Sequence, residues 1–198
     1  MCLIHLDNAT LTSLLSCQAT MLGCPLRIEG TIMPEDQHTQ DLTFMQIALE
    51  EASRAPAMGE VPIAAVIVRD NHILSQTHNY RELWQDPTAH AEIIAIRTAA
   101  AALNTWRLTD STLYVTVEPC SMCIGAIILA RVSRVVFGAW DQKGGACGSV
   151  FNIPAEPRLN HQVSVTGGVL DQECQSLVQT FFKKLRETSS ATKPLSTQ

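Results

Sequence analysis

Aromatic residues are scarce in this chain of 198 residues, at 5% of the total, and charged residues make up only 17%. Hydrophobic residues reach 46%, and most of them are alanine, valine, isoleucine and leucine, as expected where helices pack on a sheet. The formal net charge of −5 argues against a protein that coats nucleic acid indiscriminately, although it permits a local basic patch. The length suits one globular domain with some terminal excess.

Long apolar runs are also absent. No run reaches the roughly 18 residues that a membrane-spanning helix needs, and the start, MCLIHLDNATLTSLLSCQATMLGC, lacks the basic residues of a signal peptide. The seven cysteines are an odd number with uneven spacing, unlike the dense disulfide framework of a small secreted protein. We therefore expect a cytoplasmic protein without a membrane segment.

The sequence predicts three segments. Residues 1–38 show no sustained hydrophobic period and are predicted to be a poorly ordered extension, or the result of a translation start assigned too early, with Met33 as the real start. Residues 39–187 are predicted to form a single domain. The polar tail 188–198 lacks an apolar face and is predicted to be disordered.

Strand-like and helix-like patterns alternate within this domain. Asp41 is expected to cap the first helix. The other expected elements are strands at 62–68, 72–76, 112–117, 134–138 and 163–169 and helices at 89–103, 121–131 and 171–187. Such alternation predicts a mainly parallel sheet with both faces covered. The predicted fold class is α/β, with three layers (α/β/α) and a mixed, mainly parallel five-stranded central sheet.

Two cysteines, Cys120 and Cys123, stand out because they directly follow a predicted strand and open a predicted helix behind Pro119. The free amide groups at a helix start stabilise thiolates. Three interpretations are open: small apolar residues of a helix, a thioredoxin-like redox pair, or two ligands of a zinc site. Two cysteines alone do not complete a zinc site.

A third ligand is available in His90, in the first turn of the preceding predicted helix, which Thr88 or Asp86 can cap. Both helix starts are expected at the carboxyl edge of the strands, where ligands of such folds bind. One histidine and two cysteines leave a fourth zinc position for water, which is the pattern of a catalytic site. Glu92 can border the same pocket and exchange protons with that water without being a ligand.

The combination of H-A-E at 90–92 and P-C-S-M-C at 119–123 resembles the signature of zinc-dependent nucleobase and nucleoside deaminases. A closer resemblance, to bacterial tRNA-specific adenosine deaminases, covers about residues 41–187. The stretches that carry it are HNYRELWQDPTAHAEIIAIR, WRLTDSTLYVTVEPCSMCIGAIILAR, RVVFGAWDQKGGACGS and LNHQVSVTGGVLDQECQSLVQTFFKKLR. The resemblance implies a cytidine-deaminase-like fold, conversion of adenosine to inosine at the wobble position of an arginine tRNA, and a homodimer.

The resemblance also implies roles for single residues. His90, Cys120 and Cys123 would bind one zinc ion per subunit, and Glu92 would move protons. The implied contacts to the substrate, the anticodon loop, are Asn79, Asp141, Lys143, Phe182, Lys183, Lys184 and Arg186. Simpler interpretations stay open, since Asn79 could merely end a strand and the basic residues of the last helix could form a solvated face.

Two residues depart from the family pattern. Trp140 stands where a small or basic residue is expected, and Thr77 where a glycine is common. Trp140 could stack on a base or simply pack. Two other functions also fit the motif: a deaminase of free guanine or cytosine with the same zinc site, and a structural zinc module. The structural module would need a fourth ligand, for which Cys147 is the nearby option, and it would leave Glu92 without a purpose.

Overall fold

The computed structural model describes residues 36–191, which belong to the second of two compact units, Glu35–Gln198. The predicted N-terminal extension lies outside the described residues except at its end, and so do residues 192–198 of the predicted tail. Among the described residues, no helix combines the length and the hydropathy needed to cross a bilayer.

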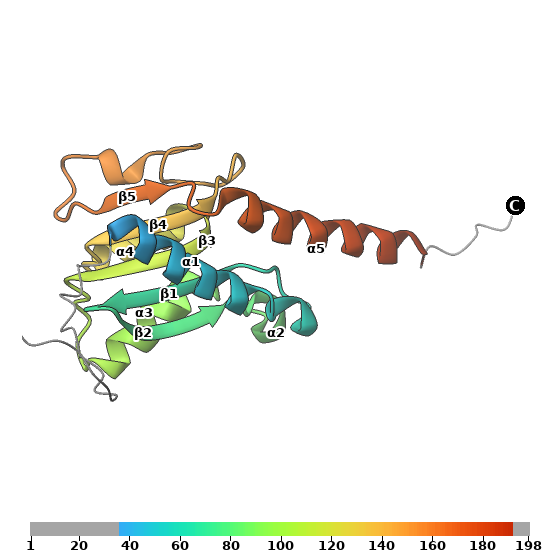
Figure 1. Cartoon of the computed structure of the whole chain (residues 1–198), viewed down its shortest axis with the longest axis horizontal. Helices are drawn as coiled ribbons and strands as arrows, with labels where there is room; N and C mark the ends of the chain where they lie inside the picture. Colours follow the sequence, from blue (N-terminus) through green and yellow to red (C-terminus); the bar gives the residue numbers. More distant parts are fainter. Residues whose placement is uncertain (1–35, 192–198) are drawn as a thin grey trace, which may run out of the picture. The chain divides into compact units, whose positions relative to one another are not determined.

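The centre of the fold is a mixed five-stranded sheet with the order β2-β1-β3-β4-β5 (Figure 1). The strands are β1 (Ala64–Arg69), β2 (His72–His78), β3 (Ser111–Val117), β4 (Arg134–Ala139) and β5 (Ser164–Gly167). β1 is antiparallel to β2 and to β3, whereas the pairs β3–β4 and β4–β5 are parallel. Within this sheet only β1 runs against the others, and the predicted fold class is confirmed.

The connection of β1 to β2 follows from the two residues between them. Asp70 and Asn71 both have positive φ, at 51° and 60°, the backbone that a tight two-residue hairpin turn requires and that these residue types tolerate. The hairpin reverses the chain at once, so β2 runs in the same direction as β3 and β4. The carboxyl ends of these three strands therefore lie at one edge of the sheet, which we call the carboxyl edge.

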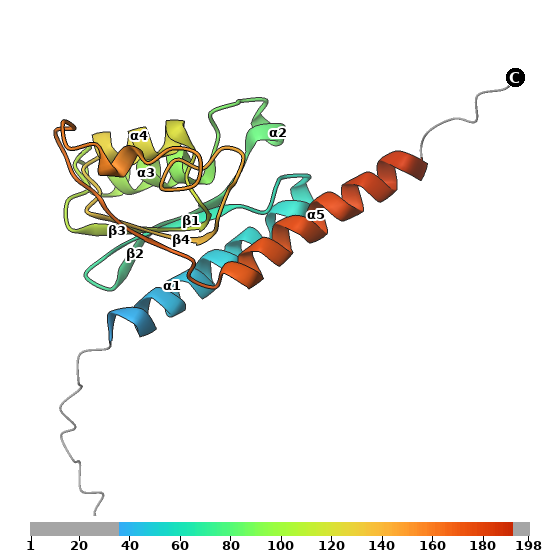
Figure 2. The ribbon, with the colours of Figure 1, turned by 90° about the horizontal axis from the view of Figure 1, so that it is seen from above.

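Helices cover both faces of the sheet (Figure 2). The long helices are α1 (Gln37–Ala52) and α5 (Asp171–Ala191) on one face and α3 (Ala91–Ala102) and α4 (Ser121–Leu129) on the other. The connections contain the short helices α2 (Arg81–Trp84), η1 (Ala55–Met58) and η2 (Ile153–Ala155).

Each face has its own hydrophobic core. On the α3 side, Ala91, Ala95 and Ala99 are fully buried; their spacing of four residues makes one narrow stripe along the helix. On the α1 side, Phe44 and Met45 pack in one cluster with residues of β4 and α5. The core on the α3 side therefore needs few aromatic residues, because the small side chains of the alanine stripe let α3 lie close to the sheet.

The ends of the outer helices differ from the prediction. α1 begins at Gln37, and Asp36 caps it, since its carboxylate accepts from the backbone N–H of His38 (3.4 Å). The prediction that Asp41 caps this helix is wrong, because Asp41 lies inside α1 and is buried. α5 continues to Ala191, beyond the predicted end of the last helix at 187.

Asp41 instead joins α1 to the sheet. Its two carboxylate oxygens each accept from the Arg134 guanidinium at 2.6 Å, and Oδ1 also accepts from the Tyr114 hydroxyl (3.0 Å). Burial raises the pKa of Asp41, but the hydrogen bonds and the charge of Arg134, together with Tyr114, lower it below its ordinary value. This two-pronged ion pair fixes α1 against β3 and β4.

We predict that Asp41→Asn lowers the free energy of unfolding by about 2–3 kcal/mol at neutral pH, because it removes the charge from a buried pair. The folded-state pKa is lowered, so the pair stabilises the protein above the ordinary pKa of 3.8, and this contribution is lost as the pH falls through the folded value. Urea unfolding of both proteins at about pH 7 and about pH 3 measures it.

The matched control is Glu50→Gln, an exposed acid on the same helix, which should change the unfolding free energy little at either pH. A difference between wild type and Asp41→Asn that stays constant over this pH range would contradict the ion-pair assignment.

Candidate metal centre and substrate pocket

Three predicted metal ligands meet at the carboxyl edge. His90 is the N-cap residue of α3, Cys120 is the N-cap residue of α4, and Cys123 lies in the first turn of α4. His90 Nδ1 lies 3.8 Å from Cys120 Sγ and 3.4 Å from Cys123 Sγ. All three ligand atoms lie within 4.8 Å of one another, and within the described part of the chain this is the one such group of His, Cys, Asp and Glu.

The spacing of these atoms fits a small tetrahedral ion. Bonds of about 2.3 Å to sulfur and about 2.0 Å to nitrogen, at tetrahedral angles, place a sulfur and a nitrogen about 3.5 Å apart. The two observed nitrogen–sulfur distances lie on either side of that value. Cys147, the possible fourth ligand of a structural site, does not belong to the group.

The charge state of the cysteine pair also suits a metal. A hydrogen bond from the Cys123 thiol lowers the pKa of Cys120 to about 3, and the same bond, with burial, raises the pKa of Cys123. The hydrogen bond with Cys120 raises the pKa of His90. One thiolate is therefore already favoured at neutral pH, and a thiolate is the form that binds a metal.

Glu92 lies beside this group without being a member of it. Its side chain is 4% exposed, and burial raises its pKa. Together with His90, Cys120 and Asn79 it lines an inner cavity of about 70 Å³. The carboxylate thus sits where it can reach a molecule held next to the three ligand atoms.

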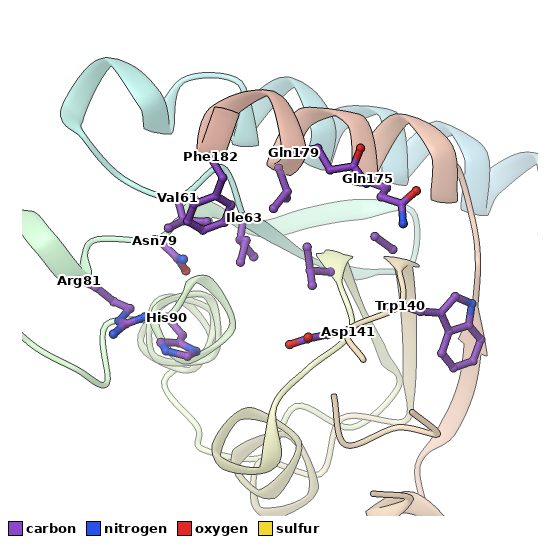
Figure 3. A pocket seen from close by; sticks show the side chains of 13 residues that line it. Val61, Ile63, Asn79, Arg81, His90, Trp140, Asp141, Gln175, Gln179 and Phe182 are labelled. Atoms are coloured by element: carbon purple, nitrogen blue, oxygen red, sulfur yellow. The ribbon is translucent and has the colours of Figure 1, made fainter. Parts of the chain in front are cut away.

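A larger pocket of about 360 Å³ opens above this inner cavity, and His90, Asn79 and Asp141 line both. Figure 3 shows His90 and Asn79 on one side and Asp141 on another, with Gln175, Gln179 and Phe182 of α5 forming a further wall. The volume lies in the range of small-molecule sites, so a flat heterocycle fits the pocket next to His90.

Sequence comparisons place the chain among known proteins. The family model for MafB19-like deaminases matches residues 39–186. A tRNA-specific adenosine deaminase of Bacillus subtilis (strain 168) is 50% identical over 153 residues, which are 77% of this chain and 95% of that protein. The chain belongs to the family of tRNA-specific adenosine deaminases. A protein of the same name from Haemophilus influenzae is 48% identical over 78% of this chain and 90% of its own length.

Solved structures agree with this assignment to the deaminase family. One from a study of A-to-I editing by tRNA:A34 deaminases at the wobble position of transfer RNA has a TM-score of 0.66 and 42% identity, and covers 68% of this chain and 98% of its own. A guanine deaminase from Nitrosomonas europaea has a TM-score of 0.60 and 25% identity, over 71% of this chain and 83% of its own. The predicted family is confirmed.

The residues implied as RNA contacts of this deaminase lie in two neighbouring places. Asn79, Asp141 and Phe182 line the pocket. A second depression of about 520 Å³, which we call the basic groove, is lined by Lys143, Val178, Gln179, Phe182, Lys183 and Arg186. Phe182 belongs to both, so the groove adjoins the pocket. Lys184 is exposed and lines neither.

Asn79 is more than the end of a strand. It follows β2 and is 4% exposed, and its side-chain oxygen accepts from the backbone N–H of Ala91 (2.9 Å), the first residue of α3. It therefore fixes the helix start that carries His90, while its own side chain borders the pocket. Thr77, the other departure from the family pattern, lies in β2 opposite Ala65 of β1.

Trp140 points away from the pocket centre (Figure 3). Its indole meets the ring of Phe137 at 90°, with centroids 4.7 Å apart, and it lies over the backbone of Gly148 and Gly167. A side chain at Gly167 would come within 2.9 Å of the indole. Trp140 also lines the pocket and is 44% exposed, so its packing on Phe137 leaves both interpretations of this residue open.

Glu118 is a residue that the sequence did not single out. It is 3% exposed and accepts hydrogen bonds from the backbone N–H groups of Asp141 (3.1 Å), Cys147 (2.8 Å) and Ser149 (3.0 Å), and also from the Ser149 hydroxyl. Burial raises its pKa, but these hydrogen bonds lower it below the ordinary value. A charged Glu118 thus holds the loop of Asp141 and Lys143 against the strand end that leads to Cys120.

We predict that Glu118→Gln lowers the free energy of unfolding by about 2 kcal/mol. The glutamine side chain replaces one acceptor oxygen by an NH₂ group, which would face the backbone N–H donors of the loop and could not accept from them. Hydrogen exchange at the amides of Cys147 and Ser149 should become faster than in the wild type. Glu156→Gln is the control, since Glu156 pairs with Arg158 at an exposed site. Unchanged exchange at both amides in Glu118→Gln would show that the carboxylate does not hold the loop.

Proposed function

We propose that this protein is a zinc-dependent hydrolase that converts adenosine to inosine at the wobble position of a tRNA anticodon. The observation that carries the proposal is that the basic groove, the pocket and the inner cavity adjoin one another through shared lining residues, with Glu92, His90 and Cys120 lining the inner cavity. The two relatives named tRNA-specific adenosine deaminase support a tRNA as the substrate. Among tRNAs, we expect an arginine tRNA.

Zinc is the metal that best suits one imidazole and two thiolates with a free fourth position. His90, Cys120 and Cys123 would hold it. When bound, zinc supplies a water molecule whose pKa is lowered to about 7.

Glu92 carries the protons of the reaction. Its carboxylate takes a proton from the attacking water, and a bond forms between the water oxygen and C6 of the purine. Glu92 gives this proton to the ring nitrogen, then takes the remaining proton of the new C6 hydroxyl and gives it to the departing amine, so that the C6–N bond breaks, a C6 carbonyl forms and ammonia leaves. The balance is adenosine and water to inosine and ammonia, with Glu92 returned to its starting state.

RNA contacts follow from the two depressions. Asn79 and Asp141 would meet the nucleoside in the pocket, and Phe182 would meet a base at the junction. Lys143, Lys183 and Arg186 would hold phosphates in the basic groove, with Lys184 adding charge nearby. An anticodon loop suits this site because its bases leave the stack at lower cost than bases of a duplex.

A deaminase of free guanine is the second candidate, because the guanine deaminase of Nitrosomonas europaea has a similar fold. The assay that separates the two uses zinc-loaded protein with an arginine-type anticodon stem–loop carrying a wobble adenosine, and in parallel free guanine and cytosine. We expect inosine in the RNA and ammonia from that reaction alone. Ammonia from a free base alone would keep the zinc chemistry and refute the RNA substrate.

We predict that Glu92→Ala keeps about one zinc ion per chain while its turnover falls by at least about 10²–10⁴-fold, the usual worth of a general acid–base group. Cys123→Ala is the matched contrast, since removing a ligand should lose the metal and also stability. Zinc content by elemental analysis and inosine formation are measured on both. A zinc-free Glu92→Ala would make Glu92 a ligand, and a fully loaded Cys123→Ala would refute the ligand set.

A homodimer fits the exposed side of the α3–α4 layer. Leu129 is 68% exposed and Trp84 is 51% exposed, and Trp84 borders a depression with Ile94 and Ala101 of α3. A second copy would cover this apolar surface; a sedimentation mass of one chain would refute it. The free cysteines of the described residues and the tRNA substrate agree with a cytoplasmic location.

A further inference from the structure

Arg81 lies in the pocket wall but has no part in the chemistry described so far. It is the first residue of α2, it is exposed, and it lines the pocket together with Asn79 and His90. Figure 3 shows its guanidinium beside His90, on a different side of the cavity from Asp141. Within the described residues, no hydrogen bond or ion pair of the Arg81 side chain is found.

The position of Arg81 is fixed from both ends of α2. The backbone N–H of Leu83 donates to Glu60 (2.8 Å), a carboxylate that is 1% exposed. The ring of Tyr80 stacks on Trp84, with centroids 4.6 Å apart, and on His78, with centroids 4.7 Å apart. Since Arg81 stands between Tyr80 and Trp84, its backbone is held beside the pocket, and its guanidinium lies within reach of the pocket rim.

Arg81 also does not belong to the basic groove, which Lys143 lines together with residues of α5. Lys143 is on the side of Asp141, whose carboxylate accepts from the Lys143 backbone N–H (2.9 Å). Arg81 therefore lies at the pocket, and the cations of the adjoining basic groove come from other elements. A nucleotide within an RNA strand is joined to a phosphate on each side, so a strand that places one base in the pocket brings two phosphates to its rim.

We propose that Arg81 binds a backbone phosphate adjoining the flipped nucleotide, in addition to those held in the basic groove, and that it thereby selects a base within an RNA strand over a free base or nucleoside. This inference rests on the proposed function. The planar guanidinium can donate two parallel hydrogen bonds to a phosphate, and binding one phosphate of a single strand contributes about 0.7 to the slope of log affinity against log salt.

The test is single-turnover deamination of a labelled anticodon stem–loop by excess zinc-loaded protein, over a range of protein and salt concentrations. Arg81→Gln should raise the half-saturating protein concentration about tenfold and lower the salt slope by about 0.7. The loss should fall on this concentration rather than on the maximal rate. Arg81→Lys should restore the slope but only part of the affinity, because it keeps the charge and loses the two-pronged geometry.

Arg107→Gln is the matched control. Arg107 is exposed and lies over the ring of Trp106 (4.1 Å to the centroid) in the segment after α3. It follows the far end of α3, whose twelve residues span about 18 Å from the end that carries His90. Arg107→Gln removes the same charge as Arg81→Gln, yet its half-saturating concentration and its salt slope should equal those of the wild type within experimental error.

Four outcomes would overturn the inference. An Arg81→Gln protein with the wild-type concentration dependence and slope would show an ordinary surface arginine. An equal loss in Arg107→Gln would show a general charge effect. A loss confined to the maximal rate would place Arg81 in the chemistry rather than in phosphate binding. Wild-type protein that forms no inosine would overturn the proposed function, and this inference with it, whereas an active wild type with an unchanged Arg81→Gln refutes the inference alone.

Discussion

The parallel pairing of β3 with β4 is the constraint on which the site depends. Because these strands run in the same direction, the segments that follow them leave at one edge, one into Cys120 and the start of α4, the other into the loop of Asp141. The β1–β2 hairpin brings the end of β2, and with it Asn79, to that edge as well. Helix starts gathered at one edge supply free amide donors toward a single point, where negative charge is then stabilised.

Two buried carboxylates, Glu92 and Glu118, line the inner cavity, and their surroundings shift their pKa values in opposite directions. Glu118 accepts from three backbone amides and one hydroxyl, which lower its pKa, whereas burial dominates at Glu92 and raises its pKa. The lowered pKa keeps Glu118 ionised, and the ionised carboxylate holds the loop of Asp141 in place. At Glu92 burial outweighs the hydrogen bonds and the charge of His90 that lower its pKa, and a raised pKa suits a group that must gain and lose protons.

Much of this arrangement could be predicted from the sequence, where the signal was local. Residues 90–92 and 119–123 each stand at a strand or loop that leads into a helix, so their meeting follows from the α/β topology alone. The error at Asp41 has a physical cause. A polar residue before an apolar helix looks like a cap, and the partner that buries its charge, Arg134, is 93 residues away in sequence. No local pattern contains that pairing.

Glu118 and the basic residues of α5 show what local sequence patterns could and could not predict. Glu118 stood in a motif, but its role depends on amides of a loop more than twenty residues later, and backbone donors leave no mark in a sequence. In contrast, the spacing of the basic residues of α5 would have been enough to predict which of them line the basic groove and which does not. Phe182 and Lys183 follow Gln179 by three and four positions, and Arg186 follows them by four and three, so these residues share one side of the helix, whereas Lys184 is turned away from it.

The place of Trp140 has a consequence for how this protein can vary. Its indole lies over Gly148 and Gly167 and reaches to within 3.8 Å of where a side chain would begin at Gly168. These glycines come from two segments that are far apart in the chain, yet they share one neighbour. A side chain at Gly167 would collide with the ring of Phe137 and begin within 2.9 Å of Trp140, whereas a side chain at Gly168 would begin at ordinary contact distance from the indole. The two rings meet edge to face beside Gly167, so a larger residue at position 167 would require both of them to move.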